Sequence, residues 1–212
     1  MEHLKLDNKW RFWIFVRSFL LWLLIVVASL AFVINLRVLY YYVMMHDNLA
    51  QNINLTPDVL KHEYQMLISY LNYPWITELN LKIPMSVQGK HHFAVVKKMF
   101  FICYSLLVIL IPINYYNWRS LRRKKQFVLL IRPFSCYFQL VLLGAVFWLF
   151  FFNQVFIDLH KIVFTDKSWI FSPITDPIIL VLPAKFFFLA GCCWLVLVEG
   201  ITFGLLKFFK VQ

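Results

Sequence analysis

The sequence predicts an all-α membrane protein, a bundle of four transmembrane helices that forms a single membrane domain over residues 1–212. Two observations carry this prediction. Hydrophobic residues make up 62% of the chain and charged residues only 15%, which is unlike a soluble globular domain. Three long runs, residues 18–36, 99–118 and 133–157, contain no charged side chain. Each run is long enough to cross a hydrocarbon core about 30 Å thick as a helix.

A fourth span is expected over residues 178–198, although this stretch contains Lys185. A lysine near a helix end can extend its ammonium group to the interface, and Pro183 is tolerated where a neighbouring helix satisfies the freed carbonyl. The first span is expected to be retained, because its apolar run is too long for a typical signal peptide.

The expected order of segments follows from these four spans. The spans are placed at residues 16–38, 87–118, 133–160 and 176–206, and the connections are an outer segment (39–85), a basic loop (119–132) and an outer loop (161–175).

The distribution of basic residues predicts the orientation of the bundle. They gather before the first span, in the second connection and in the tail; the second connection contains Arg119, Arg122, Arg123, Lys124, Lys125 and Arg132. The positive-inside rule then places both termini in the cytoplasm and the first and third connections outside, as in a multi-pass protein of the cell membrane. A net charge of +11 arranged in this way favours membrane lipid as a partner and does not indicate nucleic acid.

The outer segment is expected to contain an amphipathic helix. Thr56-Pro57-Asp58 is typical of a helix start, with a capping threonine and a proline at the first helical position. An apolar stripe at helical spacing follows, formed by Leu60, Tyr64, Leu67, Ile68 and Leu71. We expect this helix to act as a lid over the bundle. The preceding run Tyr40-Tyr41-Tyr42 is typical of an aromatic belt at the membrane interface.

Two histidines are the strongest candidates for chemistry. Ser86 is a candidate cap for the second spanning helix, which would place His92 on a packed apolar face and His91 on the solvated side. His160 ends the third span, on one face with Asn153. Because the second span starts and the third span ends at the outer side, both imidazoles should reach one depth, where ionisable groups are functional candidates. The other histidines, His3, His46 and His62, are expected to be solvated.

Two further residues are expected at the same membrane face. Trp169 lies in the outer loop, and Asp176-Pro177 resembles a cap and a first-turn proline that would start the fourth helix. We therefore count Trp169, Asp176 and Asn153 as candidates for binding or orienting a substrate.

The chain lacks the signatures of soluble enzymes, namely GxSxG, HExxH, P-loop and GxGxxG patterns. Its four cysteines fall within or at the ends of spans, without a disulfide framework or zinc spacing: Cys103, Cys136, Cys192 and Cys193. We therefore expect neither a serine or cysteine nucleophile nor a metal or other cofactor.

Sequence patterns around the two histidines resemble those of one family. The first is His92 followed by Val96-Lys97. The second, more specific part is F-x-x-x-H over residues 156–160, W-x-F-x-P-x-x-D over residues 169–176 and P-x-x-F-F over residues 183–187. Together with the four-span layout they resemble the lipoprotein intramolecular transacylase family of bacterial integral membrane proteins. The family pattern has Glu three residues before the first histidine and Asp three after it, where this chain has Gly89 and Val95.

The resemblance implies an acyltransferase that moves the sn-2 acyl chain of a lipoprotein's S-diacylglyceryl group to the α-amine of its N-terminal cysteine. The product would be the N-acyl, S-monoacylglyceryl lyso form. Nucleophile and ester belong to one substrate, so the protein mainly has to position them and move protons. We assign His160 as general base and His92 as its partner, which polarises the carbonyl or protonates the leaving oxygen.

Two alternatives of other classes stay open at this point. A bis-histidine haem protein would use His92 and His160 as axial ligands. A non-catalytic membrane assembly or accessory protein would carry the two histidines incidentally.

Overall fold

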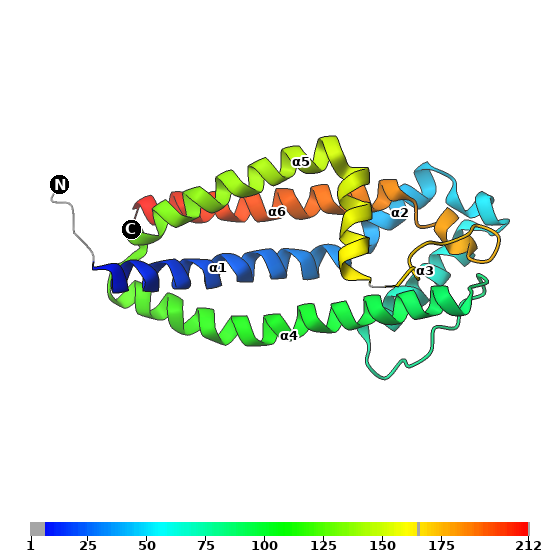
Figure 1. Cartoon of the computed structure of the whole chain (residues 1–212), viewed down its shortest axis with the longest axis horizontal. Helices are drawn as coiled ribbons and strands as arrows, with labels where there is room; N and C mark the ends of the chain where they lie inside the picture. The colour runs from blue at the N-terminus through cyan, green and yellow to red at the C-terminus, as the bar shows by residue number, and fades with distance from the viewer. Residues whose placement is uncertain (1–6, 165, 212) are drawn as a thin grey trace.

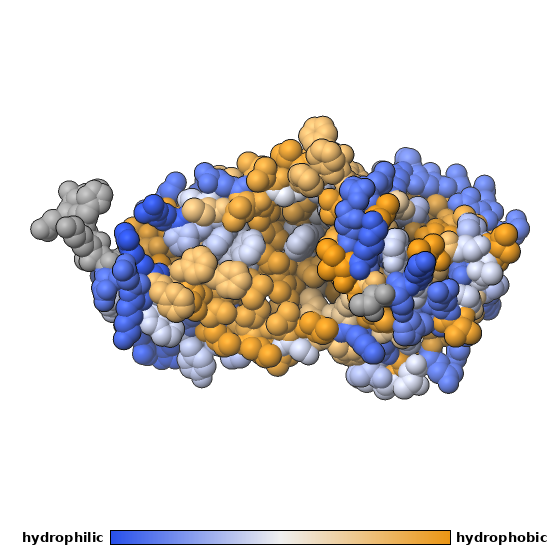
Figure 2. Space-filling model, in the orientation of Figure 1, coloured by the Kyte–Doolittle hydropathy of each residue, from blue (hydrophilic) through white to orange (hydrophobic). Residues whose placement is uncertain are grey.

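The structure, a computed structural model, describes residues 7–164 and 166–211. Within these residues, four helical segments are long and apolar enough to cross a membrane: Asn8–Ile34, Val87–Arg123, Phe127–Val163 and Ala184–Val211. They form an elongated bundle with the start of α1, the α4–α5 connection and the end of α6 at one end (Figure 1). Apolar side chains cover the middle of the face shown in Figure 2, and hydrophilic ones gather at both ends. The expected four-helix membrane fold is confirmed.

The first two spanning helices are longer than the apolar runs that predicted them. α1 covers Asn8–Ile34, and a separate helix α2 (Arg37–His46) follows after a short break. α4 covers Val87–Arg123 and starts with the cap expected at Ser86, whose Oγ accepts a hydrogen bond from Gly89 N at 3.0 Å. The basic segment 119–132 is therefore mostly helical, because charged side chains continue a helix readily once it has left the hydrocarbon.

α5 changes direction in the middle of its length. It covers Ile131–Val163, preceded by the short helix η2 (Phe127–Leu130), and Phe151 has non-helical dihedral angles of φ −123° and ψ 22°. After this kink, residues 152–163 run across the bundle toward α4, as the yellow segment in Figure 1 shows. We call residues 152–163 the arm. The arm brings the end of α5 to the start of α4.

The fourth spanning helix begins later than expected. Asp176 precedes only a short turn, η3 (Pro177–Leu180), and makes no side-chain capping bond to it, while α6 covers Ala184–Val211. The prediction that Asp176-Pro177 starts the fourth helix is wrong. Pro183 explains the shift, since it has no N–H to donate and restricts the residue before it, but it fits directly before a helix start.

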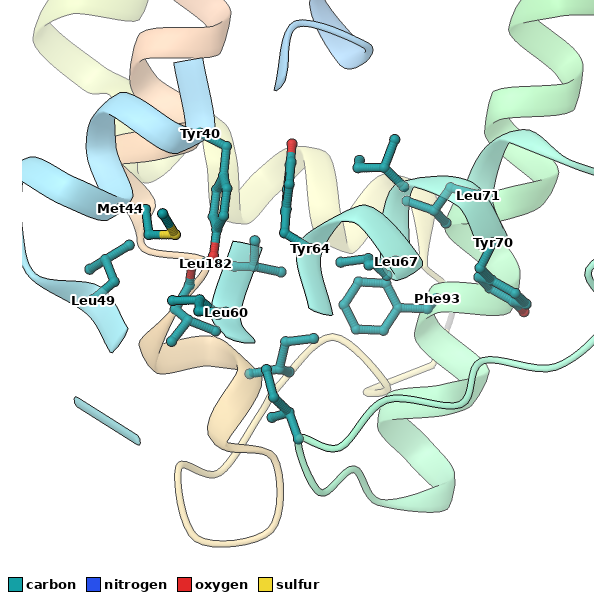
Figure 3. Close-up of a cluster of buried hydrophobic side chains, with 14 of the residues drawn as sticks. Tyr40, Met44, Leu49, Leu60, Tyr64, Leu67, Tyr70, Leu71, Phe93 and Leu182 are labelled. Carbon is teal, nitrogen blue, oxygen red and sulfur yellow. Dashed lines mark hydrogen bonds between the residues drawn. The ribbon is translucent and has the colours of Figure 1, made fainter. Parts of the chain in front are cut away.

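The end of the bundle opposite the termini has a core of its own, built from α2, η1 (Leu49–Ile53), α3 (Pro57–Asn72) and η3. We call residues 37–86 and 166–183 the distal unit. The apolar stripe of α3 is buried there, and Thr56 caps α3 as expected. Tyr40 is 1% exposed, stacks on Tyr64 with ring centroids 3.6 Å apart, and donates a hydrogen bond to the Val181 carbonyl (Figure 3).

The position of Tyr40 after the first span suggested that it belongs to an interfacial aromatic belt. Its burial shows that it does not. The new helix α2 explains the difference, because it turns this tyrosine toward α3 instead of toward lipid. The function of α3 as a lid stays a prediction.

Two lysines attach the distal unit to the spanning helices. Lys97 of α4 donates hydrogen bonds to the carbonyls of Tyr73 and Ile76, just after α3, and lies 4.3 Å from the Tyr70 ring centroid. Lys185 of α6 pairs with Asp47, at 2.6 Å and 2.9 Å to the two carboxylate oxygens. The Lys97 contacts hold the first turns of α4, which carry His92, against the distal unit, and the Lys185 pair does the same for the start of α6.

Candidate active site

His92 lies in the second turn of α4 and is 7% exposed. Three phenylalanine rings surround its imidazole: Phe164, Phe171 and Phe93, with centroids at 4.4, 5.1 and 5.4 Å. The Nδ1 atom has no hydrogen-bond partner among the residues that the structure describes. An unsatisfied buried nitrogen is unfavourable by about 1–3 kcal/mol, so a substrate group that bound it would gain from an interaction the protein leaves open.

His160 lies on the arm and faces His92. The two ring centroids are 6.2 Å apart and the ring planes differ by 14°. His160 Nδ1 is 2.7 Å from the Phe156 carbonyl oxygen. A carbonyl oxygen only accepts, so Nδ1 carries the hydrogen and Nε2 of the neutral ring holds a free lone pair. The expected meeting of the two histidines is present, and the fixed tautomer suits His160 to accept a proton.

Of the other candidates, Trp169 lies in the pocket and Asn153 lies away from it. The Trp169 ring centroid is 5.3 Å from that of His160, so the indole forms part of the wall. Asn153 is exposed on the arm. It precedes His160 by nearly two helical turns, about 10 Å along the axis, so it does not line the histidine pair.

Asp176 ties the start of α4 to the loop that follows the arm. Its carboxylate accepts hydrogen bonds from Ser86 N at 2.8 Å and from Thr175 Oγ1 at 2.7 Å, and the residue is 3% exposed. Burial acts to raise the pKa of the Asp176 carboxyl, but the hydrogen bonds from Thr175 and Ser86 outweigh it and leave the pKa below its ordinary value. The carboxylate thus sits at the N-terminus of α4, where a negative charge is favoured.

Gly89 makes this contact possible. A Cβ atom at residue 89 would overlap Asp176 Oδ1 and would come within 2.9 Å of Met85 Cγ. The absence of a side chain therefore lets the carboxylate approach the first turn of the helix that carries His92. Asp176 thus contacts the start of the helix that carries His92, through Ser86 and Gly89.

His91, the residue before His92, forms a second contact at the surface between α4 and the loop that follows the arm. His91 Nε2 is 3.1 Å from Asp166 Oδ2, and both side chains are about half exposed. Hydrogen bonds from Ser168 hold the pKa of the Asp166 carboxyl below its usual value.

His46 and His62 are exposed, as expected, and His3 lies outside the described residues.

An apolar cavity of about 300 Å³ lies beneath the arm, between α1, α5 and α6. Its lining includes Trp22, Val26, Trp148, Val155, Leu159 and Trp194. Leu159, the residue before His160 in the arm, is part of this lining. A second hollow, on α5 and its arm, shares Gly144, Trp148 and Val155 with this cavity. Over the described residues, no group of three or more His, Cys, Asp or Glu side chains is placed to hold a metal ion.

A family model described as lipoprotein intramolecular transacylase Lit matches residues 15–187, which include the histidine pair, Asp176 and the arm. The chain belongs to this transacylase family. Its members are acyltransferases that act on lipoproteins, and the resemblance seen in the sequence patterns is confirmed.

Solved structures agree with this assignment. The structure of the membrane integral lipoprotein intramolecular transacylase Lit from Bacillus cereus is 25% identical, with a TM-score of 0.85 over 97% of this chain and 96% of that one. Two structures of the same transacylase, with one histidine replaced by arginine or by alanine, are also 25% identical and have TM-scores of 0.81. They match 96% of this chain and 92% and 94% of theirs. A comparison with curated proteins gave no match.

Several residues of the candidate site were not found from the sequence. Phe164 and Phe171 form most of the wall around His92, but phenylalanine is so frequent in this chain that neither stood out. Asp166 gave no signal either. Gly89 was noted only as a departure from the family pattern, not as a close contact. Its partner across space could not be identified from the sequence.

Proposed function

We propose that this transacylase moves the sn-2 acyl chain of a diacylglyceryl-modified lipoprotein from the glycerol oxygen to the α-amine of the N-terminal cysteine. The product is the lyso form, with an N-acyl group and an S-monoacylglyceryl group. The observation that carries the proposal is the pair of nearly parallel imidazoles of His92 and His160, 6.2 Å apart in one aromatic pocket. A substrate group bound between them would reach both rings.

The reaction needs proton transfer but no nucleophile from the protein. The ammonium group loses a proton, and the free amine attacks the ester carbonyl to form the new C–N bond. The attacking nitrogen then loses a second proton to become an amide, while the C–O bond to glycerol breaks and the glycerol oxygen gains a proton. His160 is the general base in this proposal, because its hydrogen bond to the Phe156 carbonyl leaves Nε2 able to accept. His92 polarises the carbonyl or protonates the leaving oxygen.

Trp169 and Asp176 act as positioning residues, the first against the His160 ring and the second through the start of α4. The apolar cavity beneath the arm suits an acyl chain, since Leu159 lies in its wall next to the proposed base. Asn153 has no role in this proposal, because its exposed position is far along the arm.

The pocket belongs on the extracytoplasmic side of the cell membrane in this proposal. The support is the basic cluster at the α4–α5 connection, which lies at the opposite end of the bundle and would face the cytoplasm under the positive-inside rule. The substrate is then a lipoprotein held by its lipid chains in the outer leaflet.

The two alternatives are less well supported. Phe164 packs against both imidazoles, with centroid distances of 4.4 Å to His92 and 5.5 Å to His160. A haem macrocycle, far wider than either imidazole, would have to displace this side chain from both rings. Membership of the transacylase family favours an enzyme over an accessory protein.

The test is mass spectrometry of a lipoprotein N-terminus from a bacterial host without its own transacylase. Expression of this chain should give the lyso form, and His92→Ala and His160→Ala should each remove it, because a general acid or base contributes about 10²–10⁴ in rate. His46→Ala and His62→Ala are matched controls on exposed histidines of the distal unit and should convert normally. Normal conversion by both pocket variants, at equal protein levels in the membrane, would refute the site.

A further inference from the structure

Another cavity lies at the end of the bundle where α1 begins and α6 ends, far from the histidine pair. Its volume is about 430 Å³, and it lies between the first turns of α1 and the turn that joins α4 to η2. Its lining consists of Lys9, Trp10, Trp13, Ile14, Arg17, Leu121, Gln126, Leu129 and Leu130. The α1 residues among these recur at spacings of three and four positions, so they form one face of the helix.

The wall of this cavity is firmly held. Leu121 and Leu130 are 2% and 0% exposed, and they belong to the core that packs α4, η2 and α6 together. Asn117 Nδ2 donates a hydrogen bond to the Arg17 carbonyl at 3.0 Å and fixes α1 against α4 at this level. Lys125 adopts a left-handed φ of 49° in the turn beside Gln126. The cavity is therefore a formed feature of the fold rather than a gap between mobile ends.

Among the residues that the structure describes, the charged and N–H groups around the cavity have no side-chain partners. Over residues 7–164 and 166–211, neither Lys9 nor Arg17 makes an ion pair, and neither indole N–H of Trp10 and Trp13 makes a hydrogen bond. Trp10 and Trp13 are 46% and 52% exposed. Two cations and two N–H donors thus surround an opening whose deeper wall is apolar.

This combination fits one class of ligand. An anionic group is needed to match Lys9 and Arg17, and an apolar body is needed to cover Ile14, Leu121 and Leu129. The cavity lies where α1 and α4 leave their apolar stretches, the depth at which phosphate groups and tryptophan side chains meet in a bilayer. Basic pockets between spanning helices at this depth bind anionic lipid headgroups.

We infer that this cavity binds the phosphate headgroup of an anionic glycerophospholipid from the adjacent leaflet, with the phosphate on Lys9 and Arg17 and an acyl chain along Ile14 and Leu121. The site is independent of the proposed transacylase reaction. It would anchor the start of α1 against the α4–α5 connection, since the ligand contacts both.

Native mass spectrometry of the purified full-length protein tests this binding. Phosphatidylglycerol and phosphatidylcholine with the same acyl chains are titrated. One molecule of phosphatidylglycerol per protein should bind with a higher affinity than any bound molecule of phosphatidylcholine. Removing a cation near a headgroup weakens binding about fivefold, so the double variant Lys9→Gln, Arg17→Gln should lose about 25-fold in affinity. The matched control Arg132→Gln, Lys210→Gln removes the same charge at the same end of the bundle outside the cavity and should keep the tight site.

A second double variant tests the tryptophans of the cavity. The double variant Trp10→Phe, Trp13→Phe keeps the charge and should weaken the binding of phosphatidylglycerol by a smaller factor. It tests the site even if the variant without the two cations folds poorly. Equal losses in the cavity and control variants, or no loss in either, would overturn the site. Displacement of the lipid by excess inorganic phosphate alone would overturn the assignment to a lipid. Conversion of lipoprotein by the cavity variant should stay at the wild-type level, which separates this site from the histidine pocket.

Discussion

Gly89→Ala is the most informative single perturbation of the contact between α4 and the distal unit. The added Cβ would occupy the position of Asp176 Oδ1, so the carboxylate has to leave the Ser86 N–H that it now accepts from at 2.8 Å. A hydrogen bond to a charged group contributes about 1.5–3 kcal/mol, while alanine in place of glycine stabilises a helix by about 1 kcal/mol. The net expectation is a destabilisation of about 0.5–2 kcal/mol, together with a displaced start of α4 and a misplaced His92.

The assay combines thermal unfolding in detergent with the lipoprotein conversion rate. Gly89→Ala should lower both the melting temperature and the rate. Gly200→Ala is the matched control, because a Cβ there would meet no atom within 4 Å; it should leave the conversion rate unchanged and should raise, not lower, the melting temperature through helix propensity alone. If Gly89→Ala melted and converted like the wild type, the close contact between Asp176 and α4 would not be what holds His92 in place.

The remaining predictions concern Asp176, Trp169 and Tyr40. A carboxyl whose folded pKa is lowered contributes stability above its unfolded pKa. The contribution of Asp176 to stability should therefore be constant from about pH 8 to 5 and be lost only as the pH falls below 3.8. Wild type and Asp176→Asn should differ in melting temperature at neutral pH and converge in acid. Trp169→Ala removes an aromatic contact with His160 worth about 0.5–1.5 kcal/mol and should slow conversion about 2- to 10-fold with unchanged membrane levels, whereas Trp169→Phe should recover most of the rate. Tyr40→Phe leaves the buried Val181 carbonyl without its donor and should destabilise the protein by about 1–3 kcal/mol in denaturant unfolding, without a specific effect on the rate.

The sequence predicted the parts of the fold that depend on local chemistry. Uncharged runs identified the spans, and Thr56 and Ser86 were recognised as caps because a side-chain oxygen before a helix satisfies its free N–H groups. The meeting of His92 and His160 followed from counting spans, since the start of the second and the end of the third lie at the same side of the membrane.

Features that depend on contacts between distant segments were not predicted. The kink at Phe151 lies in a continuous apolar run without proline or glycine at that position, so nothing in the local sequence marked the arm. The burial of Tyr40 depends on Tyr64, in another helix. Asp176 was interpreted as the cap of the next helix, but its carboxylate is bound by the start of α4, which Gly89 alone makes accessible.

The most direct test of the central claim is a double-mutant cycle on the two histidines, measured with purified protein and a synthetic diacylglyceryl-cysteine peptide. His92→Ala and His160→Ala should each lower kcat/KM by about 10²–10⁴-fold. If both imidazoles act on one substrate in one step, the double variant should be no slower than the slower single variant, because groups that act as a unit are not additive. A double variant whose loss equalled the product of the two single losses would show that the histidines act independently and would contradict a shared pocket.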